Sequence, residues 1–329
     1  MKEILQYLFD HQTLGKEEAK TVLRNMAEGK YNDSEMAAFI TVYLMRSITV
    51  DELAGFRDAL RELCSPVDLS GFNTVDVCGT GGDEKNTFNI STLAAFVVAG
   101  AGEKVAKHGN YSVSSACGSS NVMEYFGYKF TSDPEQLKRE TDRFNICFLH
   151  APLFNPAMKN VAPVRRSLRI KTFFNMLGPM VNPSFPANQL VGVYSLDVAR
   201  IYHYLYQESD TKFCILHALD GYDEVSLTGP FRAFTRASER TMTPADLGLE
   251  KVAPADIYGG ERVEEAAQIF MRVLEGKGTG AQEDVVIANA ALALNCMDEE
   301  KGLEYHIDRA TRSLKSGGAL RTFKQLVNQ

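Results

Sequence analysis

The sequence predicts an α/β protein, with a small all-helical N-terminal domain and a larger α/β domain whose mostly parallel central sheet is covered by helices. Residues 1 to about 66 carry apolar residues at helical spacing and no strand pattern. From Phe72 onward, short β-branched runs alternate with helical segments, which is the order of a parallel sheet. Because 329 residues can bury a large core, we expect two domains, residues 1–68 and 69–329.

Composition narrows the class of protein. A hydrophobic content of 45% and a charged content of 23% are ordinary for a soluble globular protein. The net charge of −7 argues against nucleic acid or an anionic membrane as the main partner. No segment approaches the ~20 apolar residues of a membrane span. The six cysteines are scattered without a CxxC pair, so we expect a cytoplasmic protein whose cysteines are small buried residues.

Four amphipathic helices are expected in the N-terminal domain. Apolar residues at helical spacing mark segments near residues 4–8, 19–26 and 34–44. The fourth helix begins at a capping box, Thr49 with Glu52 three residues later. No residue in these helices indicates chemistry, so they form a small domain or a dimerisation module.

The larger domain is expected to alternate strands and helices. Candidate strands lie at 74–78, 104–106, 145–149, 190–195, 212–218 and 231–237. Between the third and fourth lies a long proline-rich insertion of helical character, 150–188. The helices expected at 263–274, 282–295 and 302–316 cover the sheet, and we assign them no catalytic residue.

The glycine-rich loop 79–83 follows a β-branched strand. Ser91 and Thr92 are expected to cap the helix after it, over residues 93–101, which is apolar all round and therefore buried. Small residues let backbone N–H groups approach a ligand, and a helix N-terminus attracts anions, so this unit favours phosphate binding. The glycine spacing matches neither a P-loop nor GxGxxG.

A second unit of the same kind follows directly. The strand 104–106 opens into Lys107, His108 and a loop rich in hydroxyl side chains, and a helix then runs to about Gly127. A lone lysine after a strand is usually a solvated charge, but beside these hydroxyls it is better interpreted as a phosphate contact. Two such units in tandem predict a ligand with phosphate at more than one place.

Asp223 and Glu224 form an acidic pair in a glycine-containing loop after a strand. Paired carboxylates are common on solvated surfaces. Magnesium, however, usually binds through one or two carboxylates and the phosphates of a substrate. With a phosphate site predicted elsewhere in the chain, we interpret the pair as part of a clamp for Mg²⁺ and pyrophosphate.

Seven motifs, in order along essentially the whole chain, resemble those of the anthranilate phosphoribosyltransferase family. They are GTGGD at 79–83, TFNIST at 87–92, KHGN at 107–110, PVR at 163–165, FNMLGP at 174–179, NP at 182–183 and GYDEVS at 221–226. The resemblance implies transfer of phosphoribose from 5-phosphoribosyl 1-pyrophosphate to the amine of anthranilate, in tryptophan biosynthesis, with Mg²⁺ required at two ions per monomer. It also implies a homodimer through the N-terminal helices, and a helical domain that part of the 150–188 insertion joins and that forms one wall of the cleft.

The resemblance assigns site residues as well. Those for phosphoribosyl pyrophosphate are Gly79, Gly82, Asp83, Thr87, Asn89, Ile90, Ser91, Thr92, Lys107, His108, Gly109, Asn110, Tyr111, Ser112, Val113, Ser114, Ser115 and Ser119. Those for anthranilate are Gly79, Asn110 and Arg165, and those for metal are Ser91, Asp223 and Glu224. No general acid or base is implied, because an aryl amine is already nucleophilic. Lys107 and Arg165 are expected to matter most, through positioning and electrostatics.

Histidines are expected to take no part in proton transfer. His108 is assigned a positional role beside Lys107. The remaining candidates are taken as structural: His150, His203, His217 and His306.

Five positions depart from the family's pattern. Tyr111 stands where the family usually has Arg, Glu84 and Arg169 where it has Gly, Asn121 where it has Asp, and Asn155 where it has His. Tyr111 and Glu84 make the substrate loops less positive. Asn155 and Arg169 lie near the acceptor side. The sequence therefore predicts the fold more firmly than it predicts the catalytic rate or the identity of the acceptor.

Two other functions are compatible with this architecture. A pyrimidine nucleoside phosphorylase also handles ribose and phosphate, but it needs no metal pair and usually has KHS where this chain has KHGN. A non-catalytic relative that binds nucleic acid should have a basic face, whereas this chain has a net charge of −7 and keeps Asp223 and Glu224.

Overall fold

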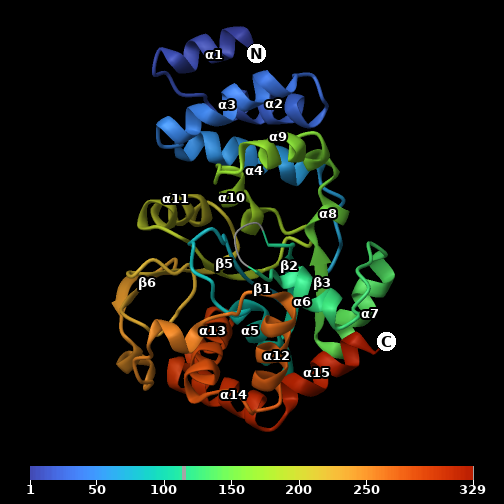
Figure 1. Cartoon of the computed structure of the whole chain (residues 1–329), viewed down its shortest axis with the longest axis vertical. Helices are drawn as coiled ribbons and strands as arrows, with labels where there is room; N and C mark the ends of the chain where they lie inside the picture. The colour runs from blue at the N-terminus through green and yellow to red at the C-terminus, as the bar shows by residue number, and fades with distance from the viewer. Residues whose placement is uncertain (113–115, 329) are drawn as a thin grey trace. The chain divides into compact units, whose positions relative to one another are not determined.

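The structure of the chain, a computed structural model, describes residues 1–112 and 116–328. It divides into two compact units, each of which draws on two parts of the chain (Figure 1). A helical unit comprises residues 1–66 and 151–183, and an α/β unit comprises residues 67–150 and 184–329. No helix in the described part of the chain is long and apolar enough to cross a membrane.

The helical unit contains the four N-terminal helices that the sequence predicts. They are α1 (Lys2–Phe9), α2 (Lys16–Ala27), α3 (Asp33–Met45) and α4 (Val50–Leu63). The second part of the chain adds α8 (Ala151–Phe154), η1 (Pro156–Lys159), α9 (Ala162–Leu168), α10 (Phe174–Leu177) and η2 (Gly178–Val181). Within this unit α2 packs against α4, and α3 packs against α9.

An aromatic cluster explains why residues 151–183 belong to this unit. Phe173 stacks on Phe56 of α4, with ring centroids 4.6 Å apart. The Phe173 ring also meets Phe39 and Tyr43 of α3 edge-on. Phe39, Phe56 and Phe173 are at most 3% exposed, so their burial contributes on the order of 2 kcal/mol each.

The capping box predicted at the start of α4 is confirmed. Thr49 Oγ1 accepts from the Glu52 N–H at 3.2 Å, and Glu52 Oε2 accepts from the Thr49 N–H at 3.0 Å. The fully buried Glu52 carboxylate also accepts two hydrogen bonds from Arg46 and one from the Leu14 N–H. Burial is the largest single effect and opposes ionisation of Glu52, but the hydrogen bonds from Arg46, Thr49 and Leu14 together with the charge of Arg46 outweigh it and lower the pKa of this carboxyl.

The α/β unit is built on one seven-stranded sheet with the order β3-β2-β1-β4-β5-β6-β7. The first five strands in this order are parallel, and β6 and β7 continue the sheet antiparallel. Their bounds are β1 (Thr74–Gly79), β2 (Lys104–Gly109), β3 (Ile146–His150), β4 (Asn188–Gly192), β5 (Lys212–Ala218), β6 (Phe231–Phe234) and β7 (Glu239–Met242). The mostly parallel sheet predicted from the sequence is confirmed.

Three strand predictions need correction. β2 continues through Lys107 and His108 to Gly109, because its pairing with β3 extends that far. β4 begins at Asn188 and ends at Gly192, two residues earlier at its start and three at its end than predicted. The segment predicted as one strand at 231–237 ends at Phe234 and turns back into β7, which the sequence analysis missed.

Helices surround the sheet and pack against its strands and against one another (Figure 1). They are α5 (Ile90–Gly100), α6 (Ser119–Tyr125), α7 (Pro134–Phe144), α11 (Leu196–Gln207), α12 (Val263–Leu274), α13 (Gly280–Met297), α14 (Leu303–Lys315) and α15 (Gly318–Val327). Two 3-10 helices lie between β7 and α12, η3 (Pro244–Leu247) and η4 (Pro254–Ile257), and a third lies between α13 and α14, η5 (Glu299–Lys301). The predicted helices at 263–274, 282–295 and 302–316 are present, and α15 is an additional one.

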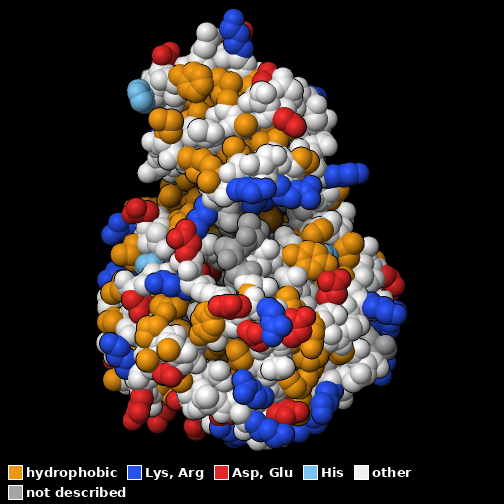
Figure 2. Space-filling model, in the orientation of Figure 1, with side chains coloured by type: hydrophobic (Ala, Val, Ile, Leu, Met, Phe, Trp, Pro, Cys, Tyr) orange, Lys and Arg blue, Asp and Glu red, His pale blue; other side chains and the backbone are white. Residues whose placement is uncertain are grey.

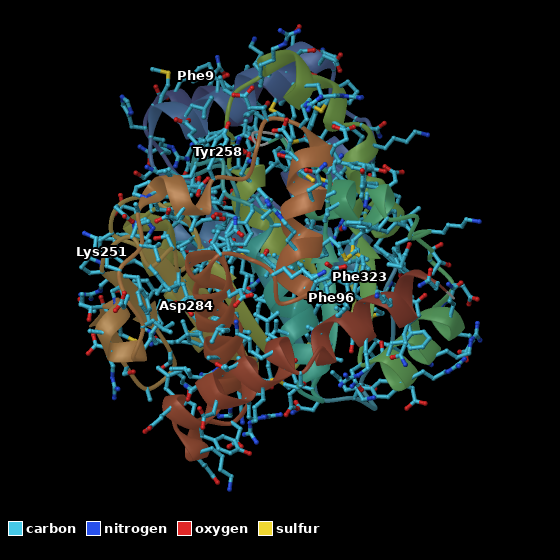
Figure 3. The ribbon with its side chains drawn as sticks, turned by 60° about the horizontal axis from the view of Figure 1, so that its bottom comes forward. Phe9, Phe96, Lys251, Tyr258, Asp284 and Phe323 are labelled. Carbon is cyan, nitrogen blue, oxygen red and sulfur yellow. The ribbon has the colours of Figure 1, made fainter. Side chains whose placement is uncertain are left out.

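Helix α5 lies at the centre of the core. It packs against β1, β2 and α13, and residues 92–99 are all at most 1% exposed. Phe96 of α5 meets Phe323 of α15 edge-on with ring centroids 5.2 Å apart (Figure 3). Burial on every side explains why this segment is apolar all round.

Candidate active site

From β1 the chain adds β2 and β3 on one side of the sheet, and it then returns to the other side of β1 to add β4 and β5. The candidate site lies at the carboxyl ends of β1 and β4, where the direction changes. Open parallel sheets bind ligands at such a point. Gly79 of β1 pairs with Gly192 of β4 at this end. A Cβ on Gly192 would overlap the backbone oxygen of Asp223, and one on Gly79 would lie 2.5 Å from Asp223 Oδ2. The two paired glycines therefore make room for the loop that carries Asp223.

The carboxylates of Asp223 and Glu224 reach the two segments that the sequence analysis singled out. Asp223 Oδ2 accepts from the Gly81 N–H at 2.8 Å, and Glu224 Oε1 accepts from the Ser91 N–H at 2.9 Å. The Asp223 N–H also donates to Asp83 Oδ2 at 3.4 Å. The structure thus brings together all three predicted metal residues, Ser91, Asp223 and Glu224.

The loop between β5 and β6, residues 219–230, is the acidic loop, and it places the carboxylates of Asp223 and Glu224 close to that of Asp83. Burial, followed by the charges of Glu224 and Asp83, holds the pKa of Asp223 well above its usual range. Burial also raises the pKa of Glu224 to about 7, against the opposing effect of the hydrogen bond from Ser91 and the charge of Lys107. Carboxylates this costly to ionise favour a bound cation.

The start of α5 differs from the prediction. Ser91 and Thr92 lie inside the first turn, and the residue before the helix is Asn89, so neither hydroxyl residue is the N-cap. Asn89 Nδ2 donates to the Cys117 carbonyl at 2.9 Å. Its Oδ1 is buried and has no hydrogen-bond partner among the described residues.

The other first-loop residues of the prediction lie around this turn. Thr87 forms an isolated bridge with Tyr258, outside the sheet. Gly82 has a φ of +75°, a conformation that favours glycine. Ile90 follows Asn89 as the first residue of α5 and is buried.

Lys107 and His108 belong to β2 and are buried, at 2% and 7% exposed. The prediction placed them in a loop after the strand, and the pairing of Lys107 with Phe148 and of His108 with Leu149 in β3 corrects it. The His108 N–H donates to Asp76 Oδ1 at 3.1 Å. The positive charge of Lys107 lowers the pKa of Glu224, so the Lys107 ammonium group interacts electrostatically with the acidic loop.

The described parts of the loop after β2, residues 110–112 and 116–118, contact the start of α6. Asn121 Oδ1 accepts from the N–H groups of Ser112 and Gly118, at 3.1 and 3.0 Å. The Ser119 hydroxyl accepts from the Asn110 N–H at 3.2 Å. Asn121 therefore links the backbone of Ser112 to that of Gly118, a role that the sequence did not indicate. Three residues of the prediction lie outside the described residues: Val113, Ser114 and Ser115.

Tyr111 packs against a histidine that the sequence analysis took as structural. Its ring meets the His150 ring edge-on at 4.9 Å, and its hydroxyl donates to Glu124 Oε1 at 3.3 Å. His150 is bonded to the Ser120 hydroxyl through Nδ1 at 2.8 Å and stacks on Phe130. Tyr111 is thus anchored beside α6 by both its ring and its hydroxyl.

The predicted anthranilate residue Arg165 lies in α9 of the helical unit. Its guanidinium stands 5.1 Å from the centre of the Phe174 ring, a cation–π arrangement, and burial lowers its pKa. Asn155 is buried in the same unit, and its Oδ1 lacks a partner among the described residues. Lys and Arg side chains gather on the surface of this unit (Figure 2). Lys159 and Arg166 of the same unit are exposed.

The acidic loop offers magnesium some oxygen ligands, and the phosphates of a bound substrate must supply others. Among the described residues, no three His, Cys, Asp or Glu side chains group closely enough to hold a metal by themselves. Magnesium prefers oxygen ligands and commonly takes part of its shell from phosphates and water. Asp223 and Glu224, with their raised pKa values, are the carboxylates that would hold it, together with Ser91.

Two family models match the chain. The helical bundle domain of a glycosyl transferase family matches residues 2–64, and the α/β domain of the same family matches residues 71–320. Together they span both units.

Curated relatives and solved structures agree with the family models. The anthranilate phosphoribosyltransferases of Flavobacterium psychrophilum and Bacteroides thetaiotaomicron are 58% and 55% identical, over 99% of this chain and 98% of theirs. The enzyme of that name from Thermus thermophilus superposes with a TM-score of 0.91 at 30% identity, covering 98% of each chain. The Saccharomyces cerevisiae enzyme, in complex with phosphoribosyl pyrophosphate and Mg, superposes with a TM-score of 0.90 at 25% identity, over 98% of this chain and 96% of that one.

Proposed function

The chain belongs to the glycosyl transferase family of the anthranilate phosphoribosyltransferases, and we propose that it transfers phosphoribose from 5-phosphoribosyl 1-pyrophosphate to the amine of anthranilate. The products are N-(5-phosphoribosyl)anthranilate and pyrophosphate, within tryptophan biosynthesis. The observation that carries the proposal is the meeting of Asp223 and Glu224 with the Gly81 and Ser91 N–H groups at the β1/β4 end of the sheet. This arrangement combines carboxylates for a metal with loops for a phosphorylated ligand.

The reaction needs stabilisation of charge more than help with proton transfer, because the amine is already nucleophilic and its proton passes to solvent once the bond from nitrogen to C1 has formed. Breaking the bond between C1 of ribose and the pyrophosphate leaves positive charge on the sugar and negative charge on the leaving group. Lys107 and the loops that follow β1 and β2 are the groups we assign to the phosphates. Mg²⁺, which we propose at two ions per monomer, supplies further neutralisation of the pyrophosphate when it is bound.

The residues of this chain that would hold the metal are Ser91, Asp223 and Glu224. Their backbone positions are already set by the contacts between α5 and the acidic loop. Preorganised groups of this kind act without reorganisation as the charge develops, and each is worth about 10²–10³ in rate.

The acceptor is placed by different groups. Arg165 carries a guanidinium, which binds a carboxylate through two parallel hydrogen bonds, and we assign it to the carboxylate of anthranilate. Asn110 and the backbone of Gly79 are assigned to the rest of the acceptor. With the amine held in line with C1, proximity supplies the remaining part of the rate.

The assay that tests this function follows the fluorescence of anthranilate with phosphoribosyl pyrophosphate, in Mg²⁺ or in EDTA. We expect fluorescence to fall only with the metal present, with pyrophosphate released in equal amount. If a folded protein binds phosphoribosyl pyrophosphate but consumes no anthranilate, the acceptor assignment is wrong, and other aryl amines and nucleobases become the substrates to screen.

We also propose a homodimer formed through the helical unit and a cytoplasmic location. Large apolar side chains remain exposed on α1 and α3, among them Phe9 at 60% and Met45 at 86%. Because α1 and α3 pack together, their exposed apolar side chains support an interaction surface, as contiguous apolar patches do.

A further inference from the structure

Asn289 is a buried polar residue in the middle of α13, a helix to which the sequence analysis assigned no role in chemistry. It is 2% exposed and is the only polar side chain between Val285 and Leu294. Burial of an amide is unfavourable unless its donors and acceptor are satisfied. The position of Asn289 therefore requires partners outside the apolar surroundings of the helix.

Those partners lie in the acidic loop. Asn289 Oδ1 accepts from the Val225 N–H at 3.2 Å, and its Nδ2 donates to the Val225 carbonyl at 2.8 Å. Nδ2 also donates to the Val285 carbonyl one turn earlier in α13, at 2.8 Å. The amide thus satisfies both backbone groups of the residue that follows Glu224, as a neighbouring strand would do.

The rest of the loop is held from the sheet. The Ala218 N–H of β5 donates to the Tyr222 carbonyl at 3.0 Å, and the Asp223 backbone lies against Gly192. Asn289 supplies the restraint on the other side of the acidic pair. Without it, the backbone after Glu224 would lose its anchor to the helix layer.

We propose that Asn289 is a positioning residue for the metal-binding carboxylates: by fixing the backbone of Val225 it sets the direction of the Glu224 side chain. This inference rests on the proposed function, because it assumes that Glu224 binds metal together with the pyrophosphate. Groups that orient metal ligands from outside typically change metal affinity by about 10–100-fold when they are removed. The same effect is expected here.

The test is Mn²⁺ binding, which reports on the site without turnover. Mn²⁺ is titrated into the full-length protein with an equal amount of phosphoribosyl pyrophosphate and no anthranilate, free Mn²⁺ is followed by electron paramagnetic resonance, and the same titration without protein is subtracted. For Asn289→Leu, which is similar in size and removes all three hydrogen bonds, we expect the dissociation constant of Mn²⁺ to rise at least about tenfold. If Asn289→Leu does not fold, Asn289→Ala makes the same test, since the smaller side chain leaves room for water at Val225.

The matched control is Leu294→Ala, a fully buried position of the same helix. It loosens α13 without removing a hydrogen bond to Val225, so its Mn²⁺ affinity should match that of the unmodified protein even as its melting temperature falls. An unchanged Mn²⁺ affinity in a folded Asn289 variant, or an equal loss in Leu294→Ala, would overturn the inference. If the unmodified protein bound no Mn²⁺ in the presence of phosphoribosyl pyrophosphate, the proposed function itself would fail, and this inference with it.

Discussion

Glu84 and Arg169 hold left-handed backbone conformations, with φ of 60° and 52°. Both stand where the family to which the chain is related usually has glycine. Arg169 ends α9, and a left-handed residue just past a helix is most often glycine because it has no Cβ. The left-handed backbone therefore accounts for glycine being usual at these two positions, whereas nothing in the structure explains the Glu and Arg that this chain carries there.

Replacing either residue with glycine should stabilise the protein. For Arg169→Gly and for Glu84→Gly we expect the free energy of unfolding to rise by about 1 kcal/mol, because the left-handed conformation is unfavourable for residues with a Cβ. Denaturant unfolding measures the change. Arg166→Gly, an exposed position inside α9, is the control and should lose about 1 kcal/mol. A loss of stability in the first two variants would contradict the explanation.

The carboxylates of Asp223 and Glu224 should be required for turnover. Asp223→Asn combined with Glu224→Gln keeps the side-chain shapes but removes both charges, so we expect kcat to fall by at least about 10²–10³. Initial rates from the anthranilate assay measure it. Glu208→Gln, an exposed acid at the end of α11, should leave the rate unchanged. Full activity in the double variant would show that the metal is held elsewhere.

The same pair predicts how stability depends on pH. The pKa of Glu224 is raised to about 7 from 4.5, and that of Asp223 is raised well above 3.8, so the folded protein binds more protons than the unfolded chain between these values. The free energy of unfolding of the metal-free protein should therefore decrease as the pH rises toward and through about 7. Melting temperatures in EDTA across this range measure the trend.

The double variant isolates the part of that trend that comes from the acidic loop. Because its side chains do not titrate, Asp223→Asn with Glu224→Gln should be the more stable protein at high pH in EDTA, and the difference should shrink as the pH falls. A constant difference across the range would mean that the two carboxyls are not perturbed.

At the scale of elements, the site depends on close approach of the acidic loop to the ends of β1 and β4. Gly192 is the tightest point, because any Cβ there meets the Asp223 backbone. Gly192→Ala should displace the loop and raise the Mg²⁺ concentration for half-maximal activity by about 10–100-fold. Mg²⁺ titrations of the rate measure this shift.

A glycine with free space around it provides the control for Gly192. Gly280 begins α13, and a Cβ added there would have no neighbouring atom within 4 Å. Gly280→Ala should keep the Mg²⁺ dependence and be at least as stable, since alanine favours the helix. An unchanged Mg²⁺ requirement in Gly192→Ala would mean that the loop tolerates the displacement.

At the scale of the whole molecule, the helical unit carries the surface expected for self-association. Sedimentation at micromolar concentration should give a species of twice the 36.4 kDa of one chain. Phe9→Glu with Met45→Glu should shift it to a single chain, because charge opposes burial of an apolar interface. Tyr204→Glu, at an exposed position of α11 in the α/β unit, should leave the assembly unchanged. A single-chain species for the unmodified protein would contradict the proposed dimer.

Local patterns in the sequence determined the elements and the candidate loops. The capping box of Thr49 and Glu52, the buried helix α5 and the glycine-rich loop after β1 were all recognisable because their signals lie within a few residues. The boundaries were less accurate. Ser91 and Thr92 resemble N-caps, yet α5 begins before them, because many polar residues near a helix start satisfy the same rule.

Only the tertiary structure decided how these pieces combine. The contacts that build the site join residues far apart in the chain: Gly81 to Asp223, Ser91 to Glu224, and Val225 to Asn289, at separations of 142, 133 and 64 residues. Periodicity and composition report which side of an element is buried, but not which partner covers it. The sequence by itself thus indicated a phosphate-binding α/β protein with an acidic pair. The pairing of Gly79 with Gly192 follows instead from the order of the strands, and the anchoring of the acidic loop by α13 follows from the packing of the helices.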